Sequence, residues 1–254
     1  MTADVSVQLY SLREESAVDF PAVLARLGRI GFVGVETATF HGLTAAQVRR
    51  TLDDAGLVAS SAHVGLAAQP DEYERALDDH QVLGCDTVVI PAIGPKSFAD
   101  LDAIRAAADL VNAANERARA RGLTLGYHNH FWELQSVIDD RPALLHLFDL
   151  VDDSVVAEVD VYWARVGGVD PVQLLGELGA RATLLHVKDG PACEPSESMV
   201  AVGDGAIDVP GVLAAAPAAR WHIIELDRCD TDMFDAVERS YHYLVENGLS
   251  RGRS

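Results

Sequence analysis

The sequence predicts an α/β fold, a single (β/α)8 barrel that occupies residues 1–254 as one domain. Eight short runs rich in β-branched and aromatic residues alternate with amphipathic stretches of helical period. The alternation is regular along the whole chain, as expected for repeated strand–helix units around a barrel. No GxGxxG motif follows the first run, whereas a doubly wound dinucleotide-binding sheet commonly has one there.

The predicted strands are residues 5–10, 32–37, 57–64, 86–92, 123–130, 154–162, 182–189 and 221–227. The clearest predicted helices between them are residues 19–31, 44–56, 71–84, 97–122 and 169–179. Residues suited to N-caps and C-caps mark the helix ends, namely Thr44, Asp71, Ser97 and Asp170, and Gly31, Gly56, Gly84 and Gly122. Residues 249–254 are expected to be frayed.

Composition excludes several classes of protein. The net charge of −19 disfavours nucleic acid and anionic membranes as partners. The three cysteines are far apart, which indicates neither a disulfide framework nor a structural zinc site and suits a reducing compartment. No signal peptide and no long apolar run is recognisable, so we expect a cytoplasmic protein. The sequence does not determine the oligomeric state, and a homo-oligomer is compatible with it.

Ionisable side chains gather at the carboxyl ends of the predicted strands, where barrel enzymes place their active groups. Glu36 ends the second strand and His63 lies near the end of the third. Each of the last four strands carries two polar residues one position apart, which therefore share a face. These pairs are His128 and His130, Glu158 and Asp160, His186 and Lys188, and Glu225 and Asp227.

A metal site is one reading of this pattern. His128 or His130, together with Asp160, His186 and Glu225, forms a mixed nitrogen and oxygen donor set suited to one divalent Mn, Co, Zn or Mg ion. Structural roles are the alternative. Glu158 also fits a buried structural carboxylate, and Asp189 and Asp227 fit caps of the following loops.

Several segments together resemble the sugar phosphate isomerase/epimerase family of the xylose isomerase-like TIM barrels. They include VQLYSLREE, GFVGVET, SAHVGL, GYHNHFWEL, EVDVYWARVGGVDP, LLHVKDG, VGDGAID and IIELD, in the family's order over nearly the whole chain. The resemblance implies one divalent ion held by strands five to eight, with Asp160, His186 and Glu225 at the family's ligand positions. Many of its epimerases have a glutamate on strand five, where this chain has His128 with His130 two residues later.

The resemblance also implies a reaction, the removal of a proton next to a carbonyl through an enediolate stabilised by the metal. Glu158, His130, Lys188 and Glu225 are the candidate acid and base residues. Aromatic rings at strand ends suit a sugar. The sequence has no Walker-type lysine that would indicate a phosphate site. We therefore expect an unphosphorylated sugar or polyol, bound by Tyr10, His63, Phe131, Trp132 and Trp163.

Three other functions stay open. A metal-dependent dehydratase or lyase acting on a keto-sugar or inosose would use the same proton abstraction, with Lys188 assisting the leaving oxygen. A sugar-binding barrel without catalysis would follow if the strand-five histidines weaken the metal site. An endonuclease of abasic DNA is disfavoured because it needs a basic groove, and this chain is strongly acidic.

Overall fold

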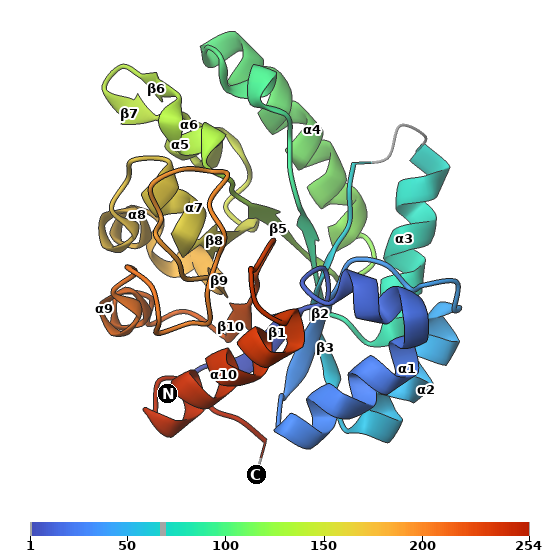
Figure 1. Cartoon of the computed structure of the whole chain (residues 1–254). Helices are drawn as coiled ribbons and strands as arrows, with labels where there is room; N and C mark the ends of the chain where they lie inside the picture. The colour runs from blue at the N-terminus through green and yellow to red at the C-terminus, as the bar shows by residue number, and fades with distance from the viewer. Residues whose placement is uncertain (1, 67–69, 254) are drawn as a thin grey trace.

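Eight parallel strands close into a barrel in the order β1-β10-β9-β8-β5-β4-β3-β2, as the computed structural model of the chain shows (Figure 1). The structure describes residues 2–66 and 70–253. The barrel strands are β1 (Asp4–Gln8), β2 (Gly34–Thr37), β3 (Val58–His63), β4 (Thr87–Ile90), β5 (Thr124–His128), β8 (Val156–Asp160), β9 (Ala182–Val187) and β10 (Trp221–Ile224). All eight predicted strands exist, and the predicted barrel is confirmed.

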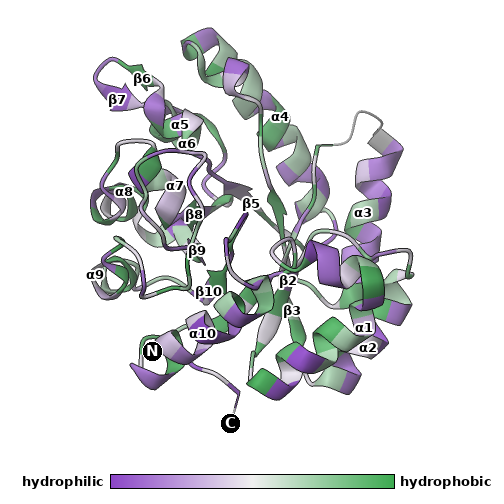
Figure 2. Cartoon of the chain, viewed as in Figure 1, coloured by the Kyte–Doolittle hydropathy of each residue, from purple (hydrophilic) through white to green (hydrophobic). Residues whose placement is uncertain are grey.

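Helices surround the barrel and join consecutive strands (Figure 1). The longer ones are α1 (Arg13–Ile30), α2 (Ala45–Ala55), α3 (Pro70–Leu83), α4 (Leu101–Arg119), α6 (Ala143–Leu150), α8 (Pro171–Leu178) and α10 (Met233–Glu246). Short elements complete the loops: η1 (Pro95–Phe98), α5 (Trp132–Gln135), the hairpin of β6 (Val137–Ile138) and β7 (Arg141–Pro142), α7 (Val161–Val166), η2 (Gly179–Arg181) and α9 (Val209–Ala214). The helices carry both hydrophobic and hydrophilic positions, as amphipathic layers require (Figure 2).

Helix ends test the cap predictions. Thr44 and Asp170 cap α2 and α8 as predicted, and Gly31 and Gly56 end α1 and α2 with left-handed backbones. Gly84 follows α3 with a φ of 77°. Gly122 ends the turn that follows α4 with a φ of 73°, and the Leu123 N–H donates to the carbonyl of Ala118 across it. The other two predictions are wrong. Asp71 lies inside the first turn of α3, and Ser97 lies in η1 while Asp100 caps α4.

The strands pair over fewer residues than predicted at their carboxyl ends. Strand β5 ends at His128 and β10 ends at Ile224, so His130 and Glu225 lie just beyond the ladder. Pairing stops there because the chain turns into the loops, which positions these side chains at the mouth of the barrel.

The carboxyl-terminal segment is not frayed. Ser250 is buried, and its Oγ is hydrogen-bonded to His222 Nδ1. The backbones of Asp4 and Arg251 form an isolated parallel β-bridge. Arg253 donates to the carbonyl oxygens of Ala55 and Gly56. Residue 254 lies outside the described residues. Within residues 2–66 and 70–253, no helix has the length and apolar character needed to cross a membrane.

Candidate active site

The four predicted metal ligands meet at the carboxyl end of the barrel. Strand β5 provides His128, β8 provides Asp160 and β9 provides His186, and Glu225 directly follows β10. All four are buried, and one donor atom from each lies within 4.8 Å of the other three. Donors bound to one divalent ion at about 2.0–2.2 Å are separated by roughly 3–4.4 Å, so this spacing fits a shared ion.

Strand register explains the meeting of these residues. Asp160 pairs with His186 across β8 and β9, and His128 pairs with Glu158 across β5 and β8. Side chains at paired positions of neighbouring parallel strands point the same way. His186 Nδ1 consequently lies 2.6 Å from Glu225 Oε2, and His128 Nε2 lies 3.8 Å from Asp160 Oδ2.

Asp160 has an oxygen available for a cation. Its Oδ1 accepts the backbone N–H of Trp163 and so caps α7. Its Oδ2 is buried and has no hydrogen-bond partner within residues 2–66 and 70–253, although Lys188 Nζ lies 2.9 Å away. A buried carboxylate oxygen that is not hydrogen-bonded is costly, so this donor set fits a divalent ion.

Lys188 is buried among carboxylates. Its Nζ lies 2.7 Å from both Glu225 Oε2 and Asp227 Oδ2. Although burial disfavours the charged amine, Asp160, Asp227 and Glu225 raise its pKa well above the ordinary value. Lys188 is therefore a fixed positive charge. Asp227, which the sequence also suits to a loop cap, is its ion-pair partner.

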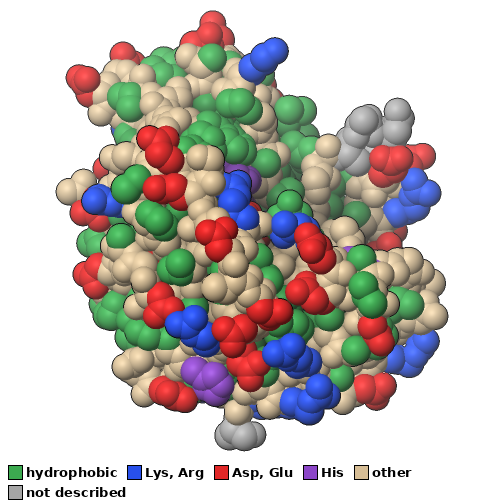
Figure 3. Space-filling model, viewed as in Figure 1, with side chains coloured by type: hydrophobic (Ala, Val, Ile, Leu, Met, Phe, Trp, Pro, Cys, Tyr) green, Lys and Arg blue, Asp and Glu red, His purple; other side chains and the backbone are tan. Residues whose placement is uncertain are grey.

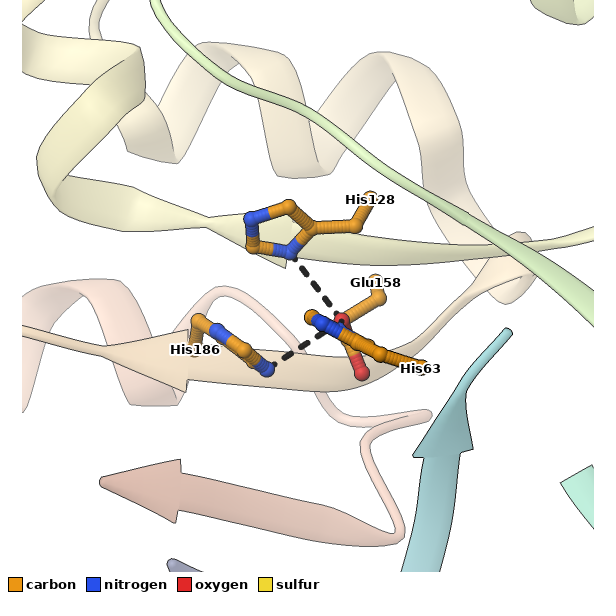
Figure 4. Close-up of side chains that lie close together, drawn as sticks. All are labelled: His63, His128, Glu158 and His186. Atoms are coloured by element: carbon orange, nitrogen blue, oxygen red, sulfur yellow. Dashed lines mark hydrogen bonds and ion pairs between the residues drawn. The ribbon is translucent and has the colours of Figure 1, made fainter. Parts of the chain in front are cut away.

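A second layer of polar residues lies beneath the ligands. Glu158 Oε2 contacts His63, His128 and His186, and these four residues form another group with donor atoms within 4.8 Å (Figure 4). Glu36 Oε1 lies 2.7 Å from His186 Nε2 and 3.1 Å from His63 Nε2. Glu36 ends a predicted strand, as the predicted ligands do, but the sequence does not indicate its contact with His186.

Glu36 is held from below. Gln8 Nε2 donates to its Oε1 and Ser61 Oγ donates to its Oε2, each at 2.5 Å. Sequence reasoning missed Gln8 and Ser61, because neutral polar residues at strand positions give no distinctive signal.

Charge is distributed unevenly over the histidines. Burial opposes the charged form of His186, but Glu158 and Glu225 outweigh it and raise its pKa well above the ordinary value. Burial lowers the pKa of His128 to about 3, and His186 contributes to that shift. Burial also lowers the pKa of His130 to about 2. His128 and His130 are therefore neutral at neutral pH, whereas His186 is charged and would release a proton on binding an ion.

The pKa values of the buried carboxyl groups also differ from one residue to the next. Burial raises the pKa of Asp160 to about 6. Burial favours a higher pKa for Glu158 as well, but His186 and His63 outweigh it and hold that pKa well below its usual range. For Glu225, Lys188 and His186 outweigh burial and lower the pKa in the same way.

A cavity of about 390 Å³ opens over this site. Its wall consists of Tyr10, Ala38, His63, Gly65, Pro91, Ala92, His128, His130, Lys188, Glu225 and Asp227. In the space-filling view, histidine atoms are visible inside a hollow beside a basic side chain (Figure 3).

The predicted substrate-binding residues occupy two positions. Tyr10 and His63 line the cavity, whereas Phe131, Trp132 and Trp163 are not part of its wall. Trp132 stacks on His130 with ring centroids 4.2 Å apart, and Lys188 Nζ lies 5.3 Å from the Trp163 ring. The tryptophans therefore support the His130 ring and the Lys188 ammonium. Glu158, a predicted catalytic residue, is fully buried and does not line the cavity either.

Comparison with known proteins identifies the family of this fold. The family model described as the xylose isomerase-like TIM barrel matches residues 24–228. The chain belongs to this family. A comparison with curated proteins finds no significant match.

Solved structures share the fold of this xylose isomerase-like barrel. A sugar phosphate isomerase/epimerase from Parabacteroides distasonis is similar with a TM-score of 0.86 and 24% identity, over 99% of this chain and 96% of that one. The probable 3-DHS dehydratase AsbF from Bacillus anthracis has a TM-score of 0.76 and 14% identity, over 96% and 99%. The IOLI protein with a bound zinc atom has a TM-score of 0.73 and 13% identity, over 96% and 97%.

Proposed function

We propose that this barrel is a divalent-metal-dependent isomerase or epimerase of an unphosphorylated ketose or related polyol. The observation that carries the proposal is the convergence of His128, Asp160, His186 and Glu225 beside a cavity with a neutral imidazole in its wall. Similar structures described as a sugar phosphate isomerase/epimerase and as a zinc-binding protein support the substrate class and the ion.

The four converging side chains would hold the ion. When bound, a divalent ion would supply positive charge that stabilises an oxyanion developing on the substrate. Lys188 adds a second fixed positive charge in the cavity wall. Together these charges would acidify a carbon-bound proton next to a substrate carbonyl.

His130 is the side chain that we assign to proton transfer. Glu225 also lines the cavity, but His186 and Lys188 occupy its Oε2. His130 has no ion-pair partner among the described residues, and its ring is neutral and held by Trp132. A proton returned to the opposite face of the same carbon gives an epimer, and a proton returned to the neighbouring carbon gives an isomer.

The cavity wall favours a substrate without phosphate. Lys188 is the only Lys or Arg among the described residues of the wall, and three carboxylates already surround it. Glu225 and Asp227 in the same wall would repel a phosphate.

Solvent deuterium exchange tests the proposal. A panel of ketoses incubated in heavy water with the manganese-loaded protein should gain deuterium at the carbon next to the carbonyl, and the metal-stripped protein should give none. His130→Gln should lower the exchange by about 10²- to 10⁴-fold. The matched control is His242→Gln on the exposed face of α10, which should leave exchange unchanged. Turnover without exchange and with a requirement for a nicotinamide would contradict proton-transfer chemistry.

A dehydratase or lyase is the second candidate. It is favoured by the Lys188 ammonium in the cavity wall, which can protonate a leaving oxygen, and by the similar structure described as a probable dehydratase. The variant Lys188→Met distinguishes a lyase from an isomerase or epimerase. In a lyase this variant should lose product release but keep proton exchange, whereas in an isomerase exchange and turnover should change together.

A further inference from the structure

The backbone of His130, the residue assigned to proton transfer, is held from both sides by buried side chains. Glu133 Oε2 accepts its N–H at 2.9 Å, and Asn129 Nδ2 donates to its carbonyl oxygen at 3.3 Å. Asn129 Oδ1 also accepts the backbone N–H of Asp160 at 3.0 Å, which joins the loop after β5 to the end of β8. Both Asn129 and Glu133 are buried.

The His130 ring is held as well. It stacks on the Trp132 indole with ring centroids 4.2 Å apart and an interplanar angle of 11°. Trp132 Nε1 in turn donates to the carbonyl oxygen of Ile93, in the loop after β4, at 3.1 Å. The place of the His130 ring in the cavity wall therefore depends on the short loop that carries both rings.

Glu133 is an uncommon residue to bury in such a loop. It is fully buried and does not line the cavity. Its Oε1 accepts the Tyr127 hydroxyl at 2.9 Å, so its hydroxyl and backbone N–H partners are both neutral groups. Burial raises its pKa to about 8. A carboxyl group buried without a cation is costly, whereas an exposed side chain could cap a short helix at less cost.

We propose that Glu133 is a positioning residue, which holds the His130 ring in the cavity wall by fixing the backbone that carries it. The inference rests on the proposed function, in which His130 moves the proton, and deepens it. The imidazole must lie within hydrogen-bond reach of the proton that it removes, and a displacement of about 1 Å can cost on the order of 10²-fold in rate. Because Glu133 lies outside the cavity wall, it acts through His130.

The competing explanation is that Glu133 only stabilises the fold at the start of α5. In that case its two hydrogen bonds should matter alike, because each satisfies one oxygen of the same buried carboxyl group. A positioning role depends on the bond to His130 alone. Tyr127 provides the matched comparison, since it is itself buried and its hydroxyl makes the other bond.

Kinetics of three variants separate these explanations. With manganese-loaded protein and a ketose in heavy water, Glu133→Leu should lower kcat for deuterium exchange about 10²-fold and leave KM nearly unchanged. Glu133→Gln should restore most of the rate, because its carbonyl oxygen can accept the His130 N–H while its amide donates to the Tyr127 oxygen. Tyr127→Phe should melt at a lower temperature and keep its exchange rate.

Equal losses of kcat in Glu133→Leu and Tyr127→Phe would overturn the inference, as would an unchanged kcat in Glu133→Leu. Absence of exchange in the unchanged protein would instead contradict the proposed function. The inference then still has a test of its own, which needs neither substrate nor metal.

NMR of the His130 ring provides that test. Stacking on the Trp132 indole shifts the carbon-bound protons of the ring upfield, and His130→Gln assigns their signals by loss. The shift should persist in Tyr127→Phe and Glu133→Gln and disappear in Glu133→Leu. A shift kept in Glu133→Leu would overturn the inference whatever the activity. Should Glu133→Leu fail to fold, Glu133→Asp, which is one carbon shorter, should reduce the shift, and an unchanged shift there would overturn the inference too.

Discussion

Alternate positions on four strands carry the polar groups of this site, and their pairing in the fold follows from that spacing. His186 Nδ1 and Lys188 Nζ, two residues apart, contact the same oxygen of Glu225. Strand periodicity was sufficient to predict that both side chains point into one site. The role of Glu36 was not predictable, because its contact with His186 joins residues 150 positions apart and depends on closure of the barrel.

Lys188 competes with a bound cation for two of the predicted ligands, Asp160 and Glu225. We expect Lys188→Met to tighten manganese binding by at least about tenfold, because a positive charge a few ångströms away is removed. Without metal the same variant should unfold several degrees lower, since buried carboxylates lose their counterion. Calorimetric titration and thermal unfolding with and without manganese measure both effects.

Lys96, the only other lysine of the chain, is exposed and provides the control. Lys96→Met should change neither property. Unchanged manganese affinity in Lys188→Met would show that the ammonium does not share its carboxylates with the ion.

The elements around the site show what local sequence predicts well and poorly. Strand and helix positions followed from periodicity, and the caps Thr44 and Asp170 followed from residue type. The loop between β9 and α9 has no periodicity, and one side chain accepts several of its backbone N–H groups. The Asp189 carboxylate accepts the backbone N–H groups of Gly190, Gly203, Gly205 and Ile207. The prediction that Asp189 caps its loop is confirmed.

Asp189→Ala should therefore destabilise the protein strongly. Four backbone N–H groups lose their acceptor, so we expect a loss of about 3–5 kcal/mol in the free energy of unfolding in urea. Asp208→Ala is the comparison, because Asp208 receives one N–H, from Gly211 at the start of α9, and should cost about 1 kcal/mol. Similar losses in the two variants would contradict the role given to Asp189.

At the scale of the whole molecule, the barrel was predictable because each strand–helix unit repeats the same pattern, so errors at single boundaries did not alter the topology. The docking of the carboxyl terminus was not predictable. Residues 249–253 contact β1, β10, the end of α1 and the turn after α2, which are distant in sequence and meet only in the folded barrel. The extent of the domain, residues 1–254, stays a prediction.

This docking makes stability depend on pH. Burial lowers the pKa of His222 to about 4, while the unfolded chain has the ordinary value near 6.5. The unfolded state therefore binds the proton first, and stability falls as the pH drops from about 6.5 to 4. Between pH 7 and 5 this single group should cost about 2 kcal/mol. His222→Asn should remove that part of the decrease in denaturant unfolding, and an unchanged decrease would contradict the assignment.

The central claim is that His128, Asp160, His186 and Glu225 hold one divalent ion. Anomalous scattering from crystals of the manganese-loaded protein tests it most directly, because the peak locates the ion without any assumption about the substrate. The account predicts one strong peak about 2.0–2.2 Å from a donor atom of each of these four side chains. No peak in the barrel, or a peak bound by His63 and Glu158 instead of Asp160 and Glu225, would contradict it.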